Sequence, residues 1–150
     1  MFYFELEELK LKDSYQPTLQ MIENISDEFQ LSNYFGTIST AITELLDLLH
    51  QLTNSENPSV FISFIVENTD FYTHIELKGA HLSFPLLFQE ATSFKVIQTI
   101  KLLTDEVSFT KDGEGISIGF HVKQGVQLGE TEKVKEQQTE VNVNQIKNNQ

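Results

Sequence analysis

Apolar and polar residues alternate near the start of the chain, and this alternation predicts a strand over residues 2–12. Three apolar residues alternate with three others of more polar character (Phe2, Phe4, Leu6 against Tyr3, Glu5, Glu7). That period of two is typical of a strand with one buried face. A break at Asp13-Ser14-Tyr15 follows, and Ser14 is a candidate cap for the helix after it.

Two helices are predicted next from apolar residues at helical spacing. The first has Pro17 in its first turn, where proline is tolerated, and runs to about Gln30. The second follows Ser32 or Asn33 as a cap, and one of its faces is apolar along its length (Ile38, Ala41, Ile42, Leu45, Leu48, Leu49, Leu52). Breaker residues at 54–58 end this second helix.

The rest of the chain to residue 122 predicts two hairpins with one helix between them. The predicted segments are strands at 60–66 and 71–77, an irregular stretch at 79–87, a helix at 88–103, and strands at 107–110 and 116–122. The resulting order, β-α-α-β-β-α-β-β, predicts a two-layer α+β sandwich. We expect a mixed, mostly antiparallel sheet with the helices on one face.

Composition changes after residue 128, which suggests a domain at 1–128 followed by a polar tail. Glu, Gln, Lys, Asn and Thr dominate residues 129–150. Such a segment buries too little apolar surface to offset its ordering entropy, so we expect it to be disordered or ordered only against a neighbour.

Charge and cysteine content exclude several function classes. The formal net charge is -12, and a nucleic-acid or anionic-membrane surface would repel such a chain. The acidity serves either solubility or the docking of a basic partner. The sequence has no cysteine, which excludes disulfides and thiolate metal sites. No apolar run is long enough to cross a bilayer, and we expect a cytoplasmic protein.

Two stretches carry a resemblance to a known family. Residues 38–46 read Ile-Ser-Thr-Ala-Ile-Thr-Glu-Leu-Leu, and residues 100–109 read Ile-Lys-Leu-Leu-Thr-Asp-Glu-Val-Ser-Phe before the turn with Gly113 and Gly115. Together with the element order, they resemble GHKL (histidine-kinase-like) ATPase domains over residues 2–123. The small anti-sigma-factor serine kinases are the most similar members.

The resemblance implies three ATP-binding places, and the chain departs from the family at each. On the long helix the family has a Glu and, four residues later, a magnesium-ligating Asn. Here Glu44 is followed by Leu48, which has no oxygen to offer a hard cation, while Asp47 stands one position earlier.

The other two places depart in the same way. Leu77 stands where the family has the Asp that accepts a hydrogen bond from adenine; Gly79 is retained, and His81 replaces the next glycine. Phe94 and Val96 fall where glycines let backbone amides approach the phosphates. We therefore expect a pseudo-ATPase without a cofactor.

The favoured function is a non-catalytic regulatory or protein-interaction domain. The resemblance implies a sigma factor, an antagonist-like protein or a second copy of the chain as partner. One alternative is an active serine kinase that binds Mg-ATP with Glu44 as general base and Asp47 at magnesium. Another is a module for a small apolar ligand, held in the vacated pocket (Leu48, Leu77, Phe94, Val96).

Two further features leave alternatives open. His74 and Glu76 share one strand face and could form a metal site with His50, His81 or His121, or simply an exposed polar pair. The apolar segment 84–88 could contact a partner or ligand, or pack into the pocket that the nucleotide has vacated.

Overall fold

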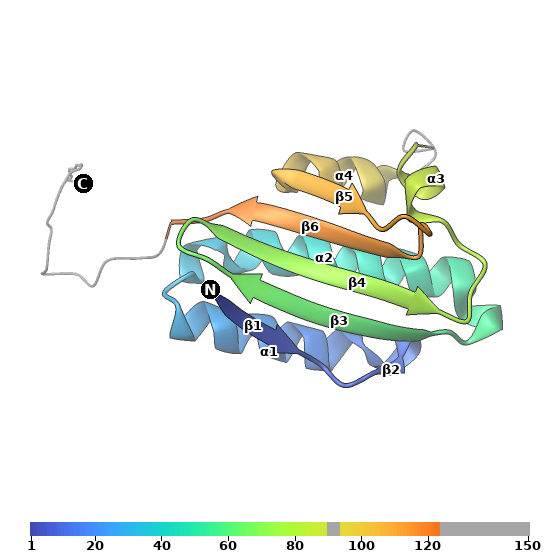
Figure 1. Cartoon of the computed structure of the whole chain (residues 1–150), viewed down its shortest axis with the longest axis horizontal. Coiled ribbons are helices and arrows are strands. Elements are labelled where there is room, and N and C mark those ends of the chain that lie inside the picture. Colours follow the sequence, from blue (N-terminus) through green and yellow to red (C-terminus); the bar gives the residue numbers. More distant parts are fainter. Residues whose placement is uncertain (90–93, 124–150) are drawn as a thin grey trace, which may run out of the picture.

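A computed structural model describes residues 1–89 and 94–123 (Figure 1). This part of the chain holds six strands: β1 (Phe2–Glu5), β2 (Leu9–Lys10), β3 (Ser59–Val66), β4 (Asp70–Lys78), β5 (Glu106–Phe109) and β6 (Gly115–His121). It also holds four α-helices: α1 (Tyr15–Glu28), α2 (Ser32–Thr53), α3 (Phe84–Gln89) and α4 (Lys95–Leu103). Two short 3-10 turns, η1 (Leu11–Asp13) and η2 (Asn54–Glu56), precede α1 and follow α2. The predicted tail at 129–150 lies outside the described residues.

The strands form one sheet in the order β1-β3-β4-β6-β5, with β2 also paired to β3. Among the described strands every pairing is antiparallel. The sequence predicted a mixed, mostly antiparallel sheet, and no parallel pair is present among these strands. The β3–β4 ladder is the longest, since it pairs Ser59 with Lys78 at one end and Val66 with Phe71 at the other. The two predicted hairpins are therefore present and lie side by side through β4 and β6.

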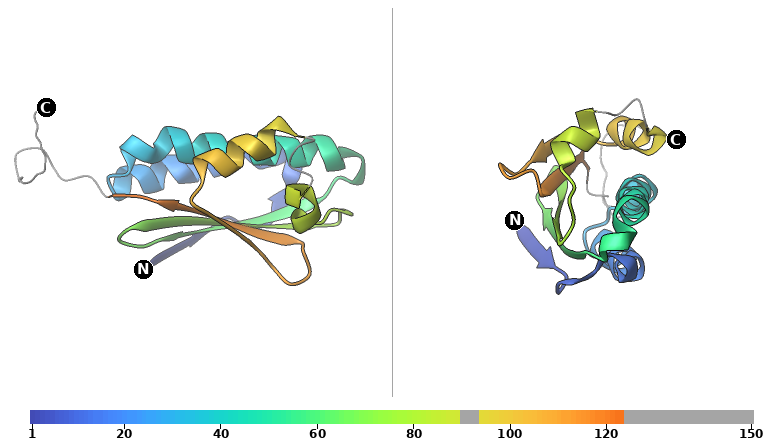
Figure 2. Two further views of the ribbon diagram at one scale, coloured as in Figure 1. Left: turned by 90° about the horizontal axis from the view of Figure 1, so that it is seen from above. Right: turned by 90° about the vertical axis from the view of Figure 1, so that its right-hand side faces the viewer.

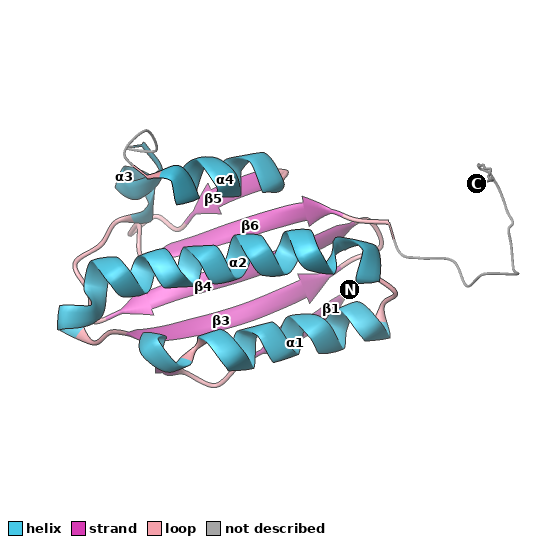
Figure 3. Cartoon of the chain, turned by 180° about the vertical axis from the view of Figure 1, so that it is seen from behind, coloured by secondary structure: helices cyan, strands magenta, loops and turns pink. Residues whose placement is uncertain are grey.

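The helices α1, α2 and α4 lie over one face of the sheet, as predicted (Figures 2 and 3). Alternate residues of the central strands point toward them and are buried, among them Phe64, Phe71 and Ile118. The apolar stripe of α2 packs onto that face with Ile38, Ile42, Leu45 and Leu49 fully buried. The result is the α+β fold of two layers that the element order indicated.

The predicted strand at 2–12 is divided in two, because the pairing with β3 shifts by one residue. Phe4 pairs with Phe64 and the Leu6 N–H donates to the Ile62 carbonyl, yet Leu9 pairs with Val60. One extra residue thus enters the first strand near Glu7, which is the signature of a β-bulge. The bulge moves the core-facing positions from the even residues of β1 to Leu9 and Leu11.

Ser14 stands at the N-cap position of α1, as predicted, but its hydroxyl donates to the Leu11 carbonyl and accepts no hydrogen bond from the helix. The predicted cap of α2 at Ser32 or Asn33 is wrong. Both residues already belong to the helix, and the N-cap residue is Leu31, whose side chain has no hydrogen-bond acceptor. Pro58 follows the turn after α2, as the breaker cluster indicated.

The segment predicted to be irregular at 79–87 contains the start of α3. Pro85 stands in the first turn of that helix, where its missing N–H costs nothing. Phe84, Leu87 and Phe88 follow helical spacing and are all buried. The helix predicted from residue 88 begins at Lys95 in α4; residues 90–93 of that prediction lie outside the described residues. Within the described chain no helix is both long and apolar enough to span a membrane.

Candidate functional site

Helix α2 carries the first of the three expected ATP-binding places. Glu44 and Asp47 are exposed on the helix surface, and Asp47 Oδ2 accepts a hydrogen bond of 3.0 Å from the Gln51 side chain. Leu48 lies one turn after Glu44 on α2 but is only 5% exposed, within the apolar core. Of these three side chains, only that of Leu48 is buried, and it has no oxygen that could bind a metal ion.

The end of β4 carries the second place. Leu77 is 4% exposed and pairs with Val60 of β3, and its backbone N–H donates to the Glu114 carbonyl at 3.0 Å. Gly79 has φ +83°, a left-handed conformation that favours glycine. A Cβ there would meet only the Pro58 Cα, at 3.9 Å. Gly79 is thus explained by the turn after β4, without any ligand.

His81 is held by a carboxylate that sequence reasoning missed. Its backbone N–H donates to Glu56 of η2 at 3.2 Å, and its ring Nδ1 lies 2.6 Å from Glu56 Oε2. The hydrogen bond from the His81 ring, helped by the one from its backbone, lowers the pKa of the Glu56 carboxyl. His81 therefore ties the loop after β4 to the turn after α2. Glu56 and His81 are 25 residues apart in sequence, and no local sequence pattern predicts their contact.

The start of α4 carries the third place. Phe94 stands just before the helix with φ -134° and ψ 118°, an extended conformation that any residue can adopt. Phe94 and Val96 are half-buried and pack against the core. The resemblance implies glycines at both positions. A phosphate that approached these backbone amides would meet the Phe94 and Val96 side chains instead.

Helix α3 is fastened beside these places by three contacts. The Phe84 N–H donates to the Gly113 carbonyl at 2.9 Å, in the turn between β5 and β6. The Lys101 ammonium of α4 donates to the Phe88 carbonyl at 3.2 Å. The Phe88 ring packs edge-on against Phe109 of β5, with centroids 5.6 Å apart. Most of the apolar segment 84–88 is therefore packed, and only Leu86 is strongly exposed.

The apolar members of the candidate site lie in or against the hydrophobic core of the described chain, whereas the acidic ones are exposed to solvent. Leu48 and Leu77 belong to one core cluster with three residues of α3, against which the start of α4 also packs (Phe84, Leu87, Phe88; Phe94, Val96). Glu44 and Asp47 lie on the solvent side of α2. Buried alkyl and phenyl groups can fill space and exclude water, but they provide neither magnesium ligands nor an acceptor for adenine.

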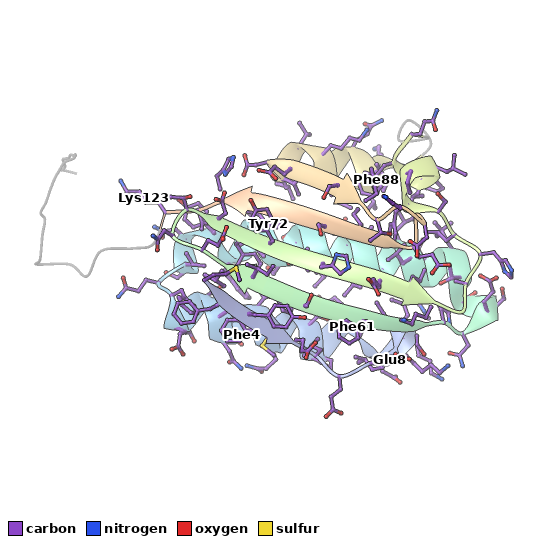
Figure 4. The ribbon with its side chains drawn as sticks, viewed as in Figure 1. Phe4, Glu8, Phe61, Tyr72, Phe88 and Lys123 are labelled. Carbon is purple, nitrogen blue, oxygen red and sulfur yellow. The ribbon has the colours of Figure 1, made fainter. Side chains whose placement is uncertain are left out.

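The histidines do not converge. Figure 4 shows Phe61 and Tyr72 on the sheet face away from the helices, and His74 shares this face because it follows Tyr72 by two residues in β4. Its Nδ1 is 2.9 Å from Ser117 Oγ and its Nε2 is 3.1 Å from Glu76 Oε2. His81 and His121 pair instead with Glu56 and Asp70. Within residues 1–89 and 94–123, no three potential metal ligands of the His, Asp or Glu type gather in one place.

A scan of the sequence against models of protein families finds no match, and a search of curated proteins finds none either.

Proposed function

We propose that this chain is a non-catalytic protein-interaction domain of the GHKL ATPase type, in which core packing has replaced the nucleotide site. The observation that carries the proposal is the burial of Leu48 and Leu77 in one continuous apolar core. These are the two positions where the resemblance requires polar side chains for magnesium and adenine. Their side chains instead stabilise the fold.

The order of elements supports the fold part of this proposal. The described chain follows the expected β-α-α-β-β-α-β-β order, with β2 and α3 as short additions. The long helix α2 runs across the sheet, and α4 precedes the final hairpin of β5 and β6 (Figure 3). Both helices stand where the resemblance places the family's first and last motifs.

The chemistry of the three places supports the loss of nucleotide binding. A magnesium ion takes oxygen ligands at about 2.1 Å in a near-octahedral shell, and Leu48 offers none. Asp47, the substitute ligand of the kinase alternative, is exposed on α2 and accepts from Gln51. Glu44 is exposed as well, so the two carboxylates lie outside the cluster that contains Leu48 and Leu77.

The interaction part of the proposal is supported by charge. A formal net charge of -12 on a chain of this size gives a negative field that attracts basic partners and accelerates their association. In this account the partner is a protein with a basic binding surface. A sigma factor or an antagonist-like protein is the kind of partner that the resemblance implies.

Isothermal titration calorimetry with ATP and magnesium tests the proposal. We expect no saturable heat with ATP up to about 1 mM, a concentration that would reveal a free energy of binding near -4 kcal/mol. A one-to-one isotherm that disappears in Glu44→Gln and Asp47→Asn would establish the kinase alternative instead. Thr40→Ala, an exposed change on the same helix, is the matched control.

A further inference from the structure

Strand β1 forms an edge of the sheet, and its outer side has no strand beside it in the described chain (Figure 1). Its inner side pairs with β3 from Phe2, opposite Val66, to Glu5, opposite Ser63. An edge strand of this kind presents unpaired backbone groups on which a strand of another chain can add.

Two backbone hydrogen bonds at the ends of β1 and β3 define which backbone groups face outward. The Leu6 N–H donates to the Ile62 carbonyl, and the Glu67 N–H donates to the Asp70 carbonyl on the other side of β3. Hydrogen-bonded pairs in an antiparallel ladder recur every second residue. Phe2 and Phe4 therefore direct their backbone groups at β3, whereas the N–H and C=O of Tyr3 and Glu5 point away from the sheet.

Two aromatic side chains at this edge are exposed. Phe2 is 56% exposed and Tyr3 is 55% exposed, on opposite faces of the strand. On the helix side, Phe2 and Phe4 pack against Phe29 at the end of α1, with ring centroids 4.9 Å and 6.1 Å apart. An added strand would extend this aromatic cluster on one face and cover the Tyr3 ring on the other.

The opposite edge, β5, is better protected on its apolar side. Its exposed aromatic residue, Phe109, is already packed by Phe88 of α3. The residues of β5 on the face away from the helices are Glu106 and Ser108. Phe2 and Tyr3 of β1 are 56% and 55% exposed and Phe109 of β5 is 38% exposed, so β1 has more uncovered aromatic surface than β5.

Charge at the β1 edge selects the chemistry of the occupant. Glu5, Glu7 and Glu8 are exposed along β1 and the bulge, and Glu67 directly follows the partner of Phe2. The nearest basic side chain along the chain, that of Lys10, donates to the Asn57 carbonyl at 3.1 Å. An incoming strand with basic side chains would complement these carboxylates.

We propose that the β1 edge accepts an extended, basic segment of a partner protein as an additional strand of the sheet. This inference rests on the proposed function as a protein-interaction domain, for which it names the surface and the partner chemistry. Backbone hydrogen bonds to Tyr3 and Glu5 hold the segment, apolar side chains cover Phe2 and Tyr3, and basic side chains face the carboxylates.

Binding of a fluorescein-labelled hexapeptide of alternating lysine and valine, followed by anisotropy, tests the backbone part of the proposal. Tyr3→Pro removes the outward N–H without removing a bond to β3, because proline is compatible with the free side of an edge strand. Tyr3→Thr removes the same ring but keeps the N–H. We expect Tyr3→Pro to bind about tenfold more weakly than Tyr3→Thr, which corresponds to about 1.4 kcal/mol and lies within the range for one lost hydrogen bond. Equal affinities would overturn the proposal.

A second measurement keeps the test decisive if Tyr3→Pro unfolds. The same peptide with N-methyl groups on alternate backbone amides is titrated against the unaltered chain, and should bind about tenfold more weakly in one of the two methylation registers. A peptide of alternating glutamate and valine should not bind, and raising the salt concentration should weaken the lysine peptide. Indifference to N-methylation in both registers would overturn strand addition.

Two other outcomes identify different errors. If the chain alone sediments as a dimer that Tyr3→Pro converts to a monomer, the edge serves a second copy and the basic segment is the wrong occupant. Saturable binding of Mg-ATP in the calorimetric titration overturns the proposed function whatever the edge does. Absence of both ATP binding and lysine-peptide binding overturns the edge proposal and leaves the loss of nucleotide binding standing.

Discussion

The imidazole Nδ1 of His121 lies 2.6 Å from Asp70 Oδ1, across the ladder that joins β6 to β4. The His121 backbone N–H also donates to Asp105 Oδ2 at 2.7 Å, just before β5. The hydrogen bond that the His121 ring donates to Asp70 raises the pKa of His121, helped by the charges of Asp105, Asp70 and Glu106 and opposed by a smaller effect of desolvation. A protonated His121 therefore links the strands β4, β5 and β6 at one end of the sheet.

The His121 contact predicts a pH-dependent part of stability. Because the folded-state pKa is raised above the ordinary value of about 6.5, its contribution is fully present below pH 6.5 and is lost as pH rises through the folded pKa. Urea unfolding of the unaltered chain and of His121→Gln should differ most at pH 5.5 and converge by pH 8.5. An NMR titration that places the His121 pKa at or below 6.5 would contradict this.

The Thr73 hydroxyl is buried in the core face of β4, between Phe64 and Ile118 of the neighbouring strands. Its Oγ1 has no hydrogen-bond partner among the described residues. Thr73→Val keeps the shape and removes an unpaired polar group, so we expect the free energy of unfolding to rise by about 1 kcal/mol. Chemical denaturation measures this change.

Thr43→Val is the matched control for Thr73→Val. The Thr43 hydroxyl is also buried, but it donates to the Ser39 carbonyl at 2.7 Å. Replacement there removes a hydrogen bond and should bring no gain in stability. A gain at Thr43 equal to that at Thr73 would show that the missing partner is not the cause.

Gly113 links the turn between β5 and β6 to α3, and its φ of +76° is a left-handed conformation that favours glycine. A Cβ there would stand 3.2 Å from Ser83 Oγ and 3.4 Å from Pro85 Cδ. Gly113→Ala should therefore cost about 1–2 kcal/mol and increase amide exchange in α3, because the Phe84 N–H donates to the Gly113 carbonyl. Hydrogen–deuterium exchange measures the local effect.

Gly36→Ala provides the opposite expectation within the same chain. Gly36 lies in α2, and a Cβ there would meet nothing within 4 Å. Alanine is the better helix former, so the free energy of unfolding should rise by about 0.5–1 kcal/mol. If both glycine variants lose stability equally, the special role of Gly113 is wrong.

Much of the fold could be predicted from periodicity. The apolar stripe from Ile38 to Leu49 predicted α2. The hairpin strands β3 and β4 differ from the prediction only at their ends. The bulge near Glu7 also left a trace, since the apolar positions change from even to odd between Leu6 and Leu9. Helix α3 begins inside the stretch predicted to be irregular, and Pro85 is compatible with its place in the first turn of that helix.

The candidate site was less accessible to sequence reasoning. The sequence alone suggested that Leu48 and Leu77 stand where the resemblance implies residues that contact magnesium and adenine. Only the structure shows that both side chains are buried in the core. The contact between Glu56 and His81 depends on two loops brought together by the fold. Gly79 matches a family motif by residue type, yet its positive φ explains it through local backbone geometry.

Unfolding of Leu77→Asp with and without Mg-ATP tests most directly the claim that packing has replaced the nucleotide site. Leu77 is 4% exposed, so a carboxylate there should lower the free energy of unfolding by about 3 kcal/mol or more, and Mg-ATP should restore none of it. The same change at Leu102, which is 86% exposed, should cost less than about 1 kcal/mol. A Leu77→Asp chain as stable as the unaltered one, or stabilised by Mg-ATP, would contradict the account.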